Sequence, residues 1–270
     1  MMTSAPQRLA PAAPSRFAFL GESRAAIDLA RMWLPLAASE CTKQTPKQDR
    51  FIMVVPGFGA DDRSTLPLRR FLKNRGYRAE GWGLGRNLAG ADLPHTLDDL
   101  DPRWDVEPRE PYNGEGGVPY LCDRLIERVR ERYAEVQTPI TLIGWSLGGY
   151  LAREAARDLP HIVDQVVTMG SPIVGGPKYT TAARFFKARK QDLDWIEAEI
   201  AKRESRPIEQ PITAIYSKTD GVVGWTAAQD YYSKNVRHIE VRGSHIGLGF
   251  NPTVWGHVLD ALGERYKQAA

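Results

Sequence analysis

The chain of 270 residues alternates short apolar runs with longer amphipathic segments from residue 51 onward. Residues 51–55 are continuously apolar and end at Pro56 and Gly57, which is typical of a strand buried on both faces. Similar strand patterns cover residues 77–82, 139–144, 162–169, 212–216 and 236–241. Apolar residues at helical spacing cover residues 63–75, 120–136, 148–159 and 252–266.

Strands and helices alternate along the chain until two strands follow each other near the end. Apolar strands joined by helices predict an α/β fold, with a mainly parallel central sheet and helices on both faces. Residues 21–270 should form a single domain, with a helix at residues 21–38 packed on its edge. A membrane-interface helix at 21–38 is the weaker interpretation, because the segment carries few basic residues. We expect residues 1–20, which begin with an Ala- and Pro-rich stretch, to be a disordered tail.

Two segments depart from this alternation. Residues 83–118 are rich in Gly, Pro and Asp, and loops of this length in a compact domain are usually functional or mobile. Residues 178–206 predict a charged, partly amphipathic helical insertion that resembles a lid. Its Phe185, Phe186 and Trp195 would form the inner face of such a lid, or simply its packing seam. We expect both segments to shape a binding site.

Composition restricts the classes of function and the compartment. Lys and Arg total 36 against 33 Asp and Glu, and this small excess, spread along the chain, does not suggest a nucleic-acid binder. The chain has neither an apolar signal region nor the about 20 consecutive apolar residues of a transmembrane helix. We therefore expect a cytoplasmic protein in which Cys41 and Cys122 are free thiols, with one disulfide between them as the alternative. The five histidines lack metal-ligand spacing, so neither a metal nor another cofactor is expected.

The strongest local pattern is Gly144-Trp145-Ser146-Leu147-Gly148, between a predicted strand and a predicted helix. It matches G-x-S-x-G, in which the serine occupies a tight turn and the flanking glycines relieve crowding of the backbone. Such a turn presents the hydroxyl at the carboxyl edge of the sheet, where the N-terminus of the next helix favours negative charge. The alternative is a glycine-rich turn in which Ser146 only caps the helix.

A serine nucleophile needs a general base, and His245 has the best position among the histidines. It follows the last strand pattern in a glycine-rich segment, so it should lie at the same sheet edge as Ser146. Asp220 follows the preceding strand and would orient His245, in the chain order Ser, Asp, His. Asp164 is a weaker candidate because it precedes its strand. A polar loop residue at 245 and an ordinary Asp-Gly turn at 220 are the alternatives.

Acyl transfer also requires donors for the negative charge that develops on the carbonyl oxygen. The backbone N–H of Leu147, which follows the serine, is one expected donor, and that of Phe58, in the loop after the first strand, is the other. Trp145 and Trp82 are candidates for an apolar acyl pocket, with core packing as the equal alternative for both.

Together these motifs resemble the α/β-hydrolase superfamily from residue 51 to the end of the chain, and within it a poorly characterised group of bacterial lipase- or esterase-like serine hydrolases. The likeness rests on residues 55–58, 77–87, 143–149, 216–223 and 243–252. It implies Ser146, Asp220 and His245 as a catalytic triad. Many lipases have His-Gly in the oxyanion loop where this chain has Pro56-Gly57, but the expected donor is a backbone group.

The expected reaction is hydrolysis of a small or lipid-like carboxylic ester through an acyl-enzyme on Ser146. His245 would take the serine proton and return it to the leaving alcohol, while Asp220 orients His245. The same residues would serve an acyltransferase that uses another alcohol or a thiol in place of water. A non-catalytic binding protein on the same fold is a third interpretation, which the intact Ser, Asp and His disfavour. The oligomeric state stays open.

Overall fold

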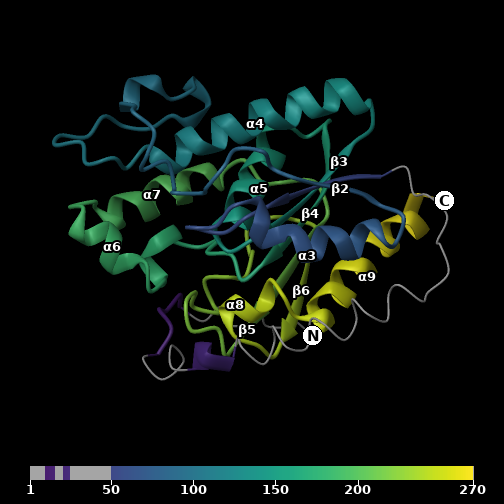
Figure 1. The fold of residues 1–270 in the computed structure, drawn as a ribbon. Coiled ribbons are helices and arrows are strands. Elements are labelled where there is room, and N and C mark those ends of the chain that lie inside the picture. The colour runs from purple at the N-terminus through teal and green to yellow at the C-terminus, as the bar shows by residue number, and fades with distance from the viewer. Residues whose placement is uncertain (1–9, 16–20, 25–49, 270) are drawn as a thin grey trace, which may run out of the picture.

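The computed structural model describes residues 10–15, 21–24 and 50–269, and its described part is built around a six-stranded parallel sheet (Figure 1). The spatial order is β2-β1-β3-β4-β5-β6. The strands are β1 (Phe51–Val55), β2 (Arg78–Gly81), β3 (Ile140–Trp145), β4 (Val163–Met169), β5 (Ile212–Ser217) and β6 (Val236–Val241). The α-helices are α3 (Asp62–Lys73), α4 (Gly117–Val136), α5 (Leu147–Asp158), α6 (Ala183–Ala188), α7 (Leu193–Arg203), α8 (His245–Leu248) and α9 (Pro252–Ala269).

The sheet has a separate hydrophobic core on each face, and β1 contributes to both. Its Phe51, Met53 and Val55 belong to the core shared with α4 and α5. Its Ile52 and Val54 belong to the core shared with α3 and α9. Successive side chains of a strand point to opposite faces, so only a continuously apolar strand can supply both cores. The predicted α/β fold with helices on both faces is confirmed.

The parallel register determines where the strands end relative to one another. Val55 of β1 pairs with Gly144 of β3, and Met169 of β4 pairs with Trp145. The carboxyl ends of these neighbouring strands therefore lie side by side. The segments that follow β1, β3, β4, β5 and β6 start from the same edge of the sheet, which is where α/β proteins bind their ligands.

Some predicted boundaries differ from the observed ones. The helix expected from residue 120 begins at Gly117, and residues 83–118 include two 3₁₀ turns, η2 (Leu97–Asp99) and η3 (Pro102–Trp104). Trp104 is buried and donates its indole N–H to Asp123 of α4 at 2.9 Å, so this segment is packed on the domain. The predicted insertion at 178–206 consists of α6, α7 and part of the 3₁₀ turn η4 (Gly176–Tyr179).

Only parts of the predicted N-terminal tail and helix belong to the described residues. Within 1–20 these are residues 10–15, where the N–H of Ala12 donates to Oγ1 of Thr226 at 3.1 Å. Within 21–38, the structure describes the 3₁₀ turn η1 (Gly21–Arg24); the rest of that predicted helix lies outside the described residues. Cys122 is a buried free thiol, and burial raises its pKa well above the ordinary value; Cys41 lies outside the described residues.

Candidate active site

Ser146 occupies a strained turn between β3 and α5. Its backbone has φ 55° and ψ −130°, a region that residues other than glycine rarely adopt. A Cβ at Gly144 would lie 2.3 Å from the carbonyl oxygen of Gly148, and one at Gly148 would lie 2.3 Å from that of Val55. Both positions therefore require glycine. The Ser146 side chain makes no capping hydrogen bond to α5, which argues against a purely capping role.

Ser146, His245 and Asp220 form a hydrogen-bonded series at the carboxyl edge of the sheet. Oγ of Ser146 lies 2.9 Å from Nε2 of His245, and Nδ1 of His245 lies 2.7 Å from Oδ2 of Asp220. Since a carboxylate only accepts, Nδ1 carries the proton in this arrangement and Nε2 is free to accept the serine proton. Asp220 and His245 are both buried, which strengthens their interaction.

Local hydrogen bonds hold the two partners of Ser146. Oδ1 of Asp220 accepts the N–H groups of Val222 and Val223, both at 2.8 Å, so Oδ2 remains for His245. His245 was expected in a loop, but it is the first residue of the short helix α8. Its carbonyl oxygen accepts the indole N–H of Trp145 at 3.1 Å. The residue beside Ser146 thus also contacts the backbone of the histidine.

The other candidates for these roles lie elsewhere. Asp164 is the second residue of β4, at the opposite end of the strand from Ser146, and its Oδ1 accepts the hydroxyl of Thr141. His238 lies within β6, and His257 lies within α9.

The loop after β1 passes directly against the serine. A Cβ at Gly57 would lie 3.0 Å from Cβ of Ser146 and 3.7 Å from its Oγ, so glycine permits this close approach. The next residue, Phe58, and Leu147 both line the cavity that contains Ser146. Within the described residues, the backbone N–H groups of Phe58 and Leu147 have no hydrogen-bond partner. They are free to donate to a substrate oxygen beside Ser146.

A cavity of about 320 Å³ opens beside Ser146 and has mainly apolar walls. The insertion contributes Phe186, Trp195 and Ile196, and α4 contributes Val118. Apart from His245, the acidic and basic side chains that line it are Glu115, Glu199 and Arg203. Each of the three has an ion-pair partner: Arg109 for Glu115, Lys202 for Glu199, and Glu154 for Arg203. This cavity suits a neutral, apolar group.

The two tryptophans predicted for an acyl pocket have different positions. Trp145 lines the cavity, and its ring centroid lies 6.0 Å from that of His245. Trp82 does not line it: the side chain is fully buried in the core, and its Nε1 donates to the carbonyl of Gly85 at 3.0 Å. The expectation for Trp82 is therefore corrected to core packing.

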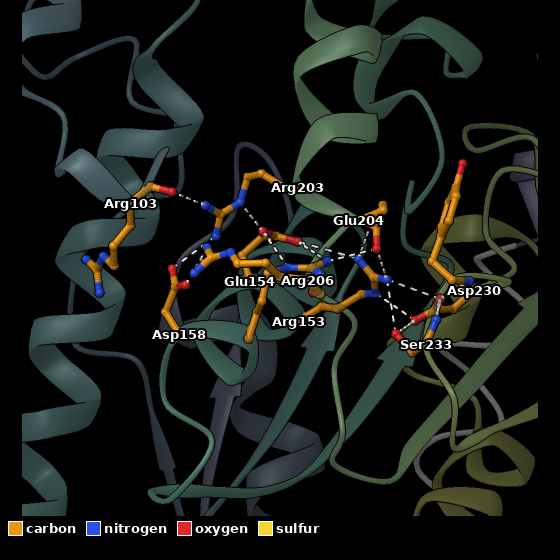
Figure 2. Close-up of polar contacts among 11 residues, drawn as sticks. Arg103, Arg153, Glu154, Asp158, Arg203, Glu204, Arg206, Asp230 and Ser233 are labelled. Atoms are coloured by element: carbon orange, nitrogen blue, oxygen red, sulfur yellow. Dashed lines mark hydrogen bonds and ion pairs between the residues drawn. The ribbon is translucent and has the colours of Figure 1, made fainter. Parts of the chain in front are cut away.

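A buried ion-pair network, which sequence patterns did not indicate, connects α5 to the end of α7 (Figure 2). The guanidinium of Arg153 binds both oxygens of Glu204, at 2.6 and 2.8 Å, and both oxygens of Asp230, at 2.6 and 3.1 Å. Burial opposes its charge, but Glu204 and Asp230 outweigh this and raise the pKa of Arg153. Four charged residues in six positions of a helix could not be recognised as buried from sequence alone.

The second half of the network involves Arg203 at the wall of the cavity. Its guanidinium donates to Glu154 at 2.6 Å and to Asp158 at 3.0 Å, and it lies 3.8 Å above the ring of Trp104. Burial raises the pKa of Glu154, but Arg157, Arg203 and Arg153 together lower it to about 2. These buried ion pairs join α5, the helix that follows Ser146, to the end of the insertion, and breaking one of them would leave an unpaired buried charge.

One further residue contacts the site, and no sequence pattern pointed to it. The carboxylate of Glu22, in η1, accepts the N–H groups of Gly221, His245 and Ile246 at 2.8, 2.8 and 3.1 Å. Glu22 lies more than a hundred residues before Ser146 in a segment with no recognised motif. Its position at the site could be found only from the structure.

Neither metal-ligand clusters nor membrane-spanning helices occur in the described part of the chain. In residues 10–15, 21–24 and 50–269, no three or more His, Cys, Asp and Glu side chains are grouped so that they could hold a metal ion. The described helices are too short or too polar to cross a bilayer.

Comparison with known proteins shows the fold. No family model matches the chain. It is 33% identical over 91 residues to the pimeloyl-[acyl-carrier protein] methyl ester esterase of Aromatoleum aromaticum, a match that covers 34% of this chain and 34% of that enzyme. The match to a structure from work on the metagenome-derived lipolytic enzymes LipS and LipT covers 82% of this chain and 96% of that chain, with a TM-score of 0.54 at 11% identity. The match to the naproxen esterase of Bacillus subtilis covers 80% of this chain and 85% of that enzyme, with a TM-score of 0.53 at 9% identity.

A third similar structure is α/β hydrolase domain-containing protein 10 from mouse. The match covers 84% of this chain and 94% of the mouse protein's chain, with a TM-score of 0.52 at 15% identity. At such identities the similarity concerns the fold, and the chemistry has to be argued from the residues of this chain.

Proposed function

We propose that this chain, which has the α/β-hydrolase fold, is a serine hydrolase that cleaves carboxylic esters through an acyl-enzyme on Ser146. The observation that carries the proposal is the hydrogen-bonded series from Ser146 through His245 to Asp220, with distances of 2.9 and 2.7 Å. A serine hydroxyl at a strained turn becomes nucleophilic when an oriented imidazole can remove its proton. The partial match to an esterase supports ester chemistry.

In the first half of the reaction, Oγ of Ser146 bonds to the carbonyl carbon of the ester while Nε2 of His245 takes the hydroxyl proton. Asp220 stabilises the imidazolium that results. The N–H groups of Phe58 and Leu147 donate to the oxygen that becomes negative in the tetrahedral intermediate. The C–O bond to the alcohol then breaks, and Nε2 gives its proton to the leaving oxygen.

In the second half, water takes the place of the alcohol. Nε2 of His245 removes a proton from the water as its oxygen bonds to the acyl carbon of the Ser146 ester. The intermediate collapses, the bond to Oγ breaks, and His245 returns the proton to Ser146. The acid product leaves and the free enzyme is restored.

The acyl group is proposed to occupy the apolar cavity and to carry no charge. Arg203, the positively charged side chain of the wall, is already paired with Glu154, so a carboxylate on the acyl group would meet no free cation there. Each methylene transferred from water to such walls contributes about 0.8 kcal/mol. Trp145, beside the nucleophile, forms part of this proposed pocket.

The insertion at 178–206 is proposed to form one wall of the pocket. Because Arg203 and Glu204 bind α5 through buried ion pairs, the end of α7 stays with the domain. Any lid movement is therefore confined to the part of the insertion that precedes Arg203.

Hydrolysis of p-nitrophenyl butyrate by the wild type and by Ser146→Ala tests the proposal. We expect the variant to lose at least about 10³-fold in kcat. Equal rates for the two proteins would refute the assignment of Ser146. Product analysis with ethanol added to the assay separates hydrolysis, which yields the free acid, from acyl transfer, which yields the ethyl ester.

A further inference from the structure

Glu22 joins the two segments that carry the proposed acid and base. Its Oε1 accepts the N–H of Gly221, which follows Asp220, and the N–H of His245 itself, both at 2.8 Å. Its Oε2 accepts the N–H of Ile246 at 3.1 Å. Three backbone donors thus meet one carboxylate, and hydrogen bonds to an ionised acceptor are stronger than neutral ones.

The chain around Glu22 reaches this place by its own contacts with the domain. Figure 1 shows η1 beside α8, at the lower edge of the molecule in that view. Earlier in the chain, Ala12 donates its N–H to Thr226, and a Cβ at Gly224 would lie only 1.8 Å from the carbonyl oxygen of Ala12. The N-terminal segment therefore packs closely on the loop after β5 at a second point.

The hydrogen bonds of Glu22 differ from the local ones, which hold the Asp220 loop and the start of α8 separately. Asp220 is fixed within its own loop by Val222 and Val223, and the start of α8 is fixed by Ser244, whose Oγ accepts the N–H of Gly247. Neither set joins the loop to the helix. Ser217 and Thr219 bond the carbonyl of Gly243, just before the helix, and Glu22 adds a direct link between the backbone N–H groups of residue 221 and of residues 245–246.

We propose that Glu22 is a positioning residue that clamps the Asp220 loop to the His245 helix and so keeps the imidazole aligned with Ser146. This inference rests on the proposed function, since the alignment matters only if the three residues act together. Without the clamp, Ser217 and Thr219 still donate to the carbonyl of Gly243, but the backbones of residues 221 and 245–246 lose their shared acceptor. Displacement of a catalytic group by about 1 Å can cost about 100-fold in rate.

The test compares Glu22→Ala and Glu22→Gln with the wild type in full-length protein. In Glu22→Ala we expect kcat for p-nitrophenyl butyrate to fall at least about tenfold, with KM within about twofold. The kcat of Glu22→Gln should lie between those of the wild type and Glu22→Ala. Its amide keeps one acceptor oxygen, but its NH₂ group faces a backbone N–H and cannot accept from it. Amide hydrogen exchange at residues 218–223 and 243–248 should become faster in Glu22→Ala, whether or not the protein hydrolyses esters.

Asp62→Ala is the matched control. Its carboxylate also accepts two backbone N–H groups of another segment, those of Trp82 and Gly83 at 3.0 Å each, but it contacts neither Asp220 nor His245. This variant should be less stable than the wild type, but its kcat should stay within about threefold of the wild-type value. The clamp is refuted if Glu22→Ala keeps kcat within twofold of the wild type or leaves exchange in both segments unchanged, even when its melting temperature falls. If the wild type shows no esterase activity but amide exchange in both segments is faster in Glu22→Ala, the proposed function is refuted and the structural role of Glu22 is supported.

Discussion

Nδ1 of His245 lies 2.7 Å from Oδ2 of Asp220, and this bond decides which ring nitrogen of the histidine faces Ser146 without a proton. The second carboxylate oxygen of Asp220 is occupied by two backbone N–H groups, so the side chain cannot rotate without losing them. The orientation of the imidazole is thus fixed by the backbone of the loop after β5.

Asp220→Asn should therefore abolish most activity without unfolding the protein. The amide oxygen would keep the bonds to Val222 and Val223, and the NH₂ group would then face Nδ1 and force the proton onto Nε2. A protonated Nε2 cannot accept the serine proton, and kcat is expected to fall by about 10³- to 10⁴-fold. Asp164→Asn is the control and should stay within about threefold of the wild type. Similar losses in both variants would show that Asp220 has no special role.

Gly57→Ala should reduce kcat by displacing the loop that carries the Phe58 N–H. The added Cβ would lie 3.0 Å from Cβ of Ser146 and 3.3 Å from the carbonyl oxygen of Trp145, which are both rigidly held. Loss of one oxyanion donor costs about 10²- to 10³-fold in kcat, so we expect a reduction of up to about 100-fold for a partial displacement. Gly256→Ala, where a Cβ would contact nothing within 4 Å, should leave kcat unchanged. Steady-state kinetics of the two variants measures the difference.

If the acyl group occupies the cavity, kcat/KM should depend on the length of the acyl chain of the substrate. For p-nitrophenyl esters from acetate upward, kcat/KM should rise about fourfold for each methylene until the cavity is filled. Ile196→Trp adds bulk to the wall and should move the optimum to a shorter acyl chain while leaving the rate on acetate within about threefold. A flat profile in the wild type, or an unchanged optimum in the variant, would contradict the assignment of this cavity to the acyl group.

The network on α5 predicts a specific dependence of stability on pH. The folded-state pKa of Glu154 is lowered from 4.5 to about 2, so its contribution is complete above pH 5 and is lost as pH falls toward 2. Glu154→Gln should lower the free energy of unfolding by about 3 kcal/mol at pH 7 and flatten its decrease between pH 5 and 2. The exposed Glu131, which pairs with Arg128, provides the control Glu131→Gln, expected to change stability by less than about 0.5 kcal/mol. Denaturant unfolding measured across this pH range tests the prediction.

The sequence predicted the fold and the tight turn at Ser146 because both depend on local patterns. Buried parallel strands are continuously apolar, and the turn at Ser146 excludes side chains at Gly144 and Gly148 for reasons of distance. The positions of Asp220 and His245 followed from a rule of topology, since segments after parallel strands meet at one edge of the sheet.

Other features depend on contacts between distant segments, which no local pattern encodes. Trp82 was predicted for the acyl pocket, but its side chain is buried in the core, where the indole N–H donates to the carbonyl of Gly85. Glu22 and the charged face of α5 look like ordinary polar positions, and only the packing of η1 on α8 and of α7 on α5 makes them part of the site.

The central claim, that Ser146 is an activated nucleophile, is tested most directly by labelling with a fluorophosphonate probe. We expect the wild type to gain the mass of one phosphonyl group on the peptide containing Ser146, Ser146→Ala to gain none, and Asp220→Asn to be labelled far more slowly. Equal labelling of the wild type and Ser146→Ala, or no labelling of either folded protein, would contradict it.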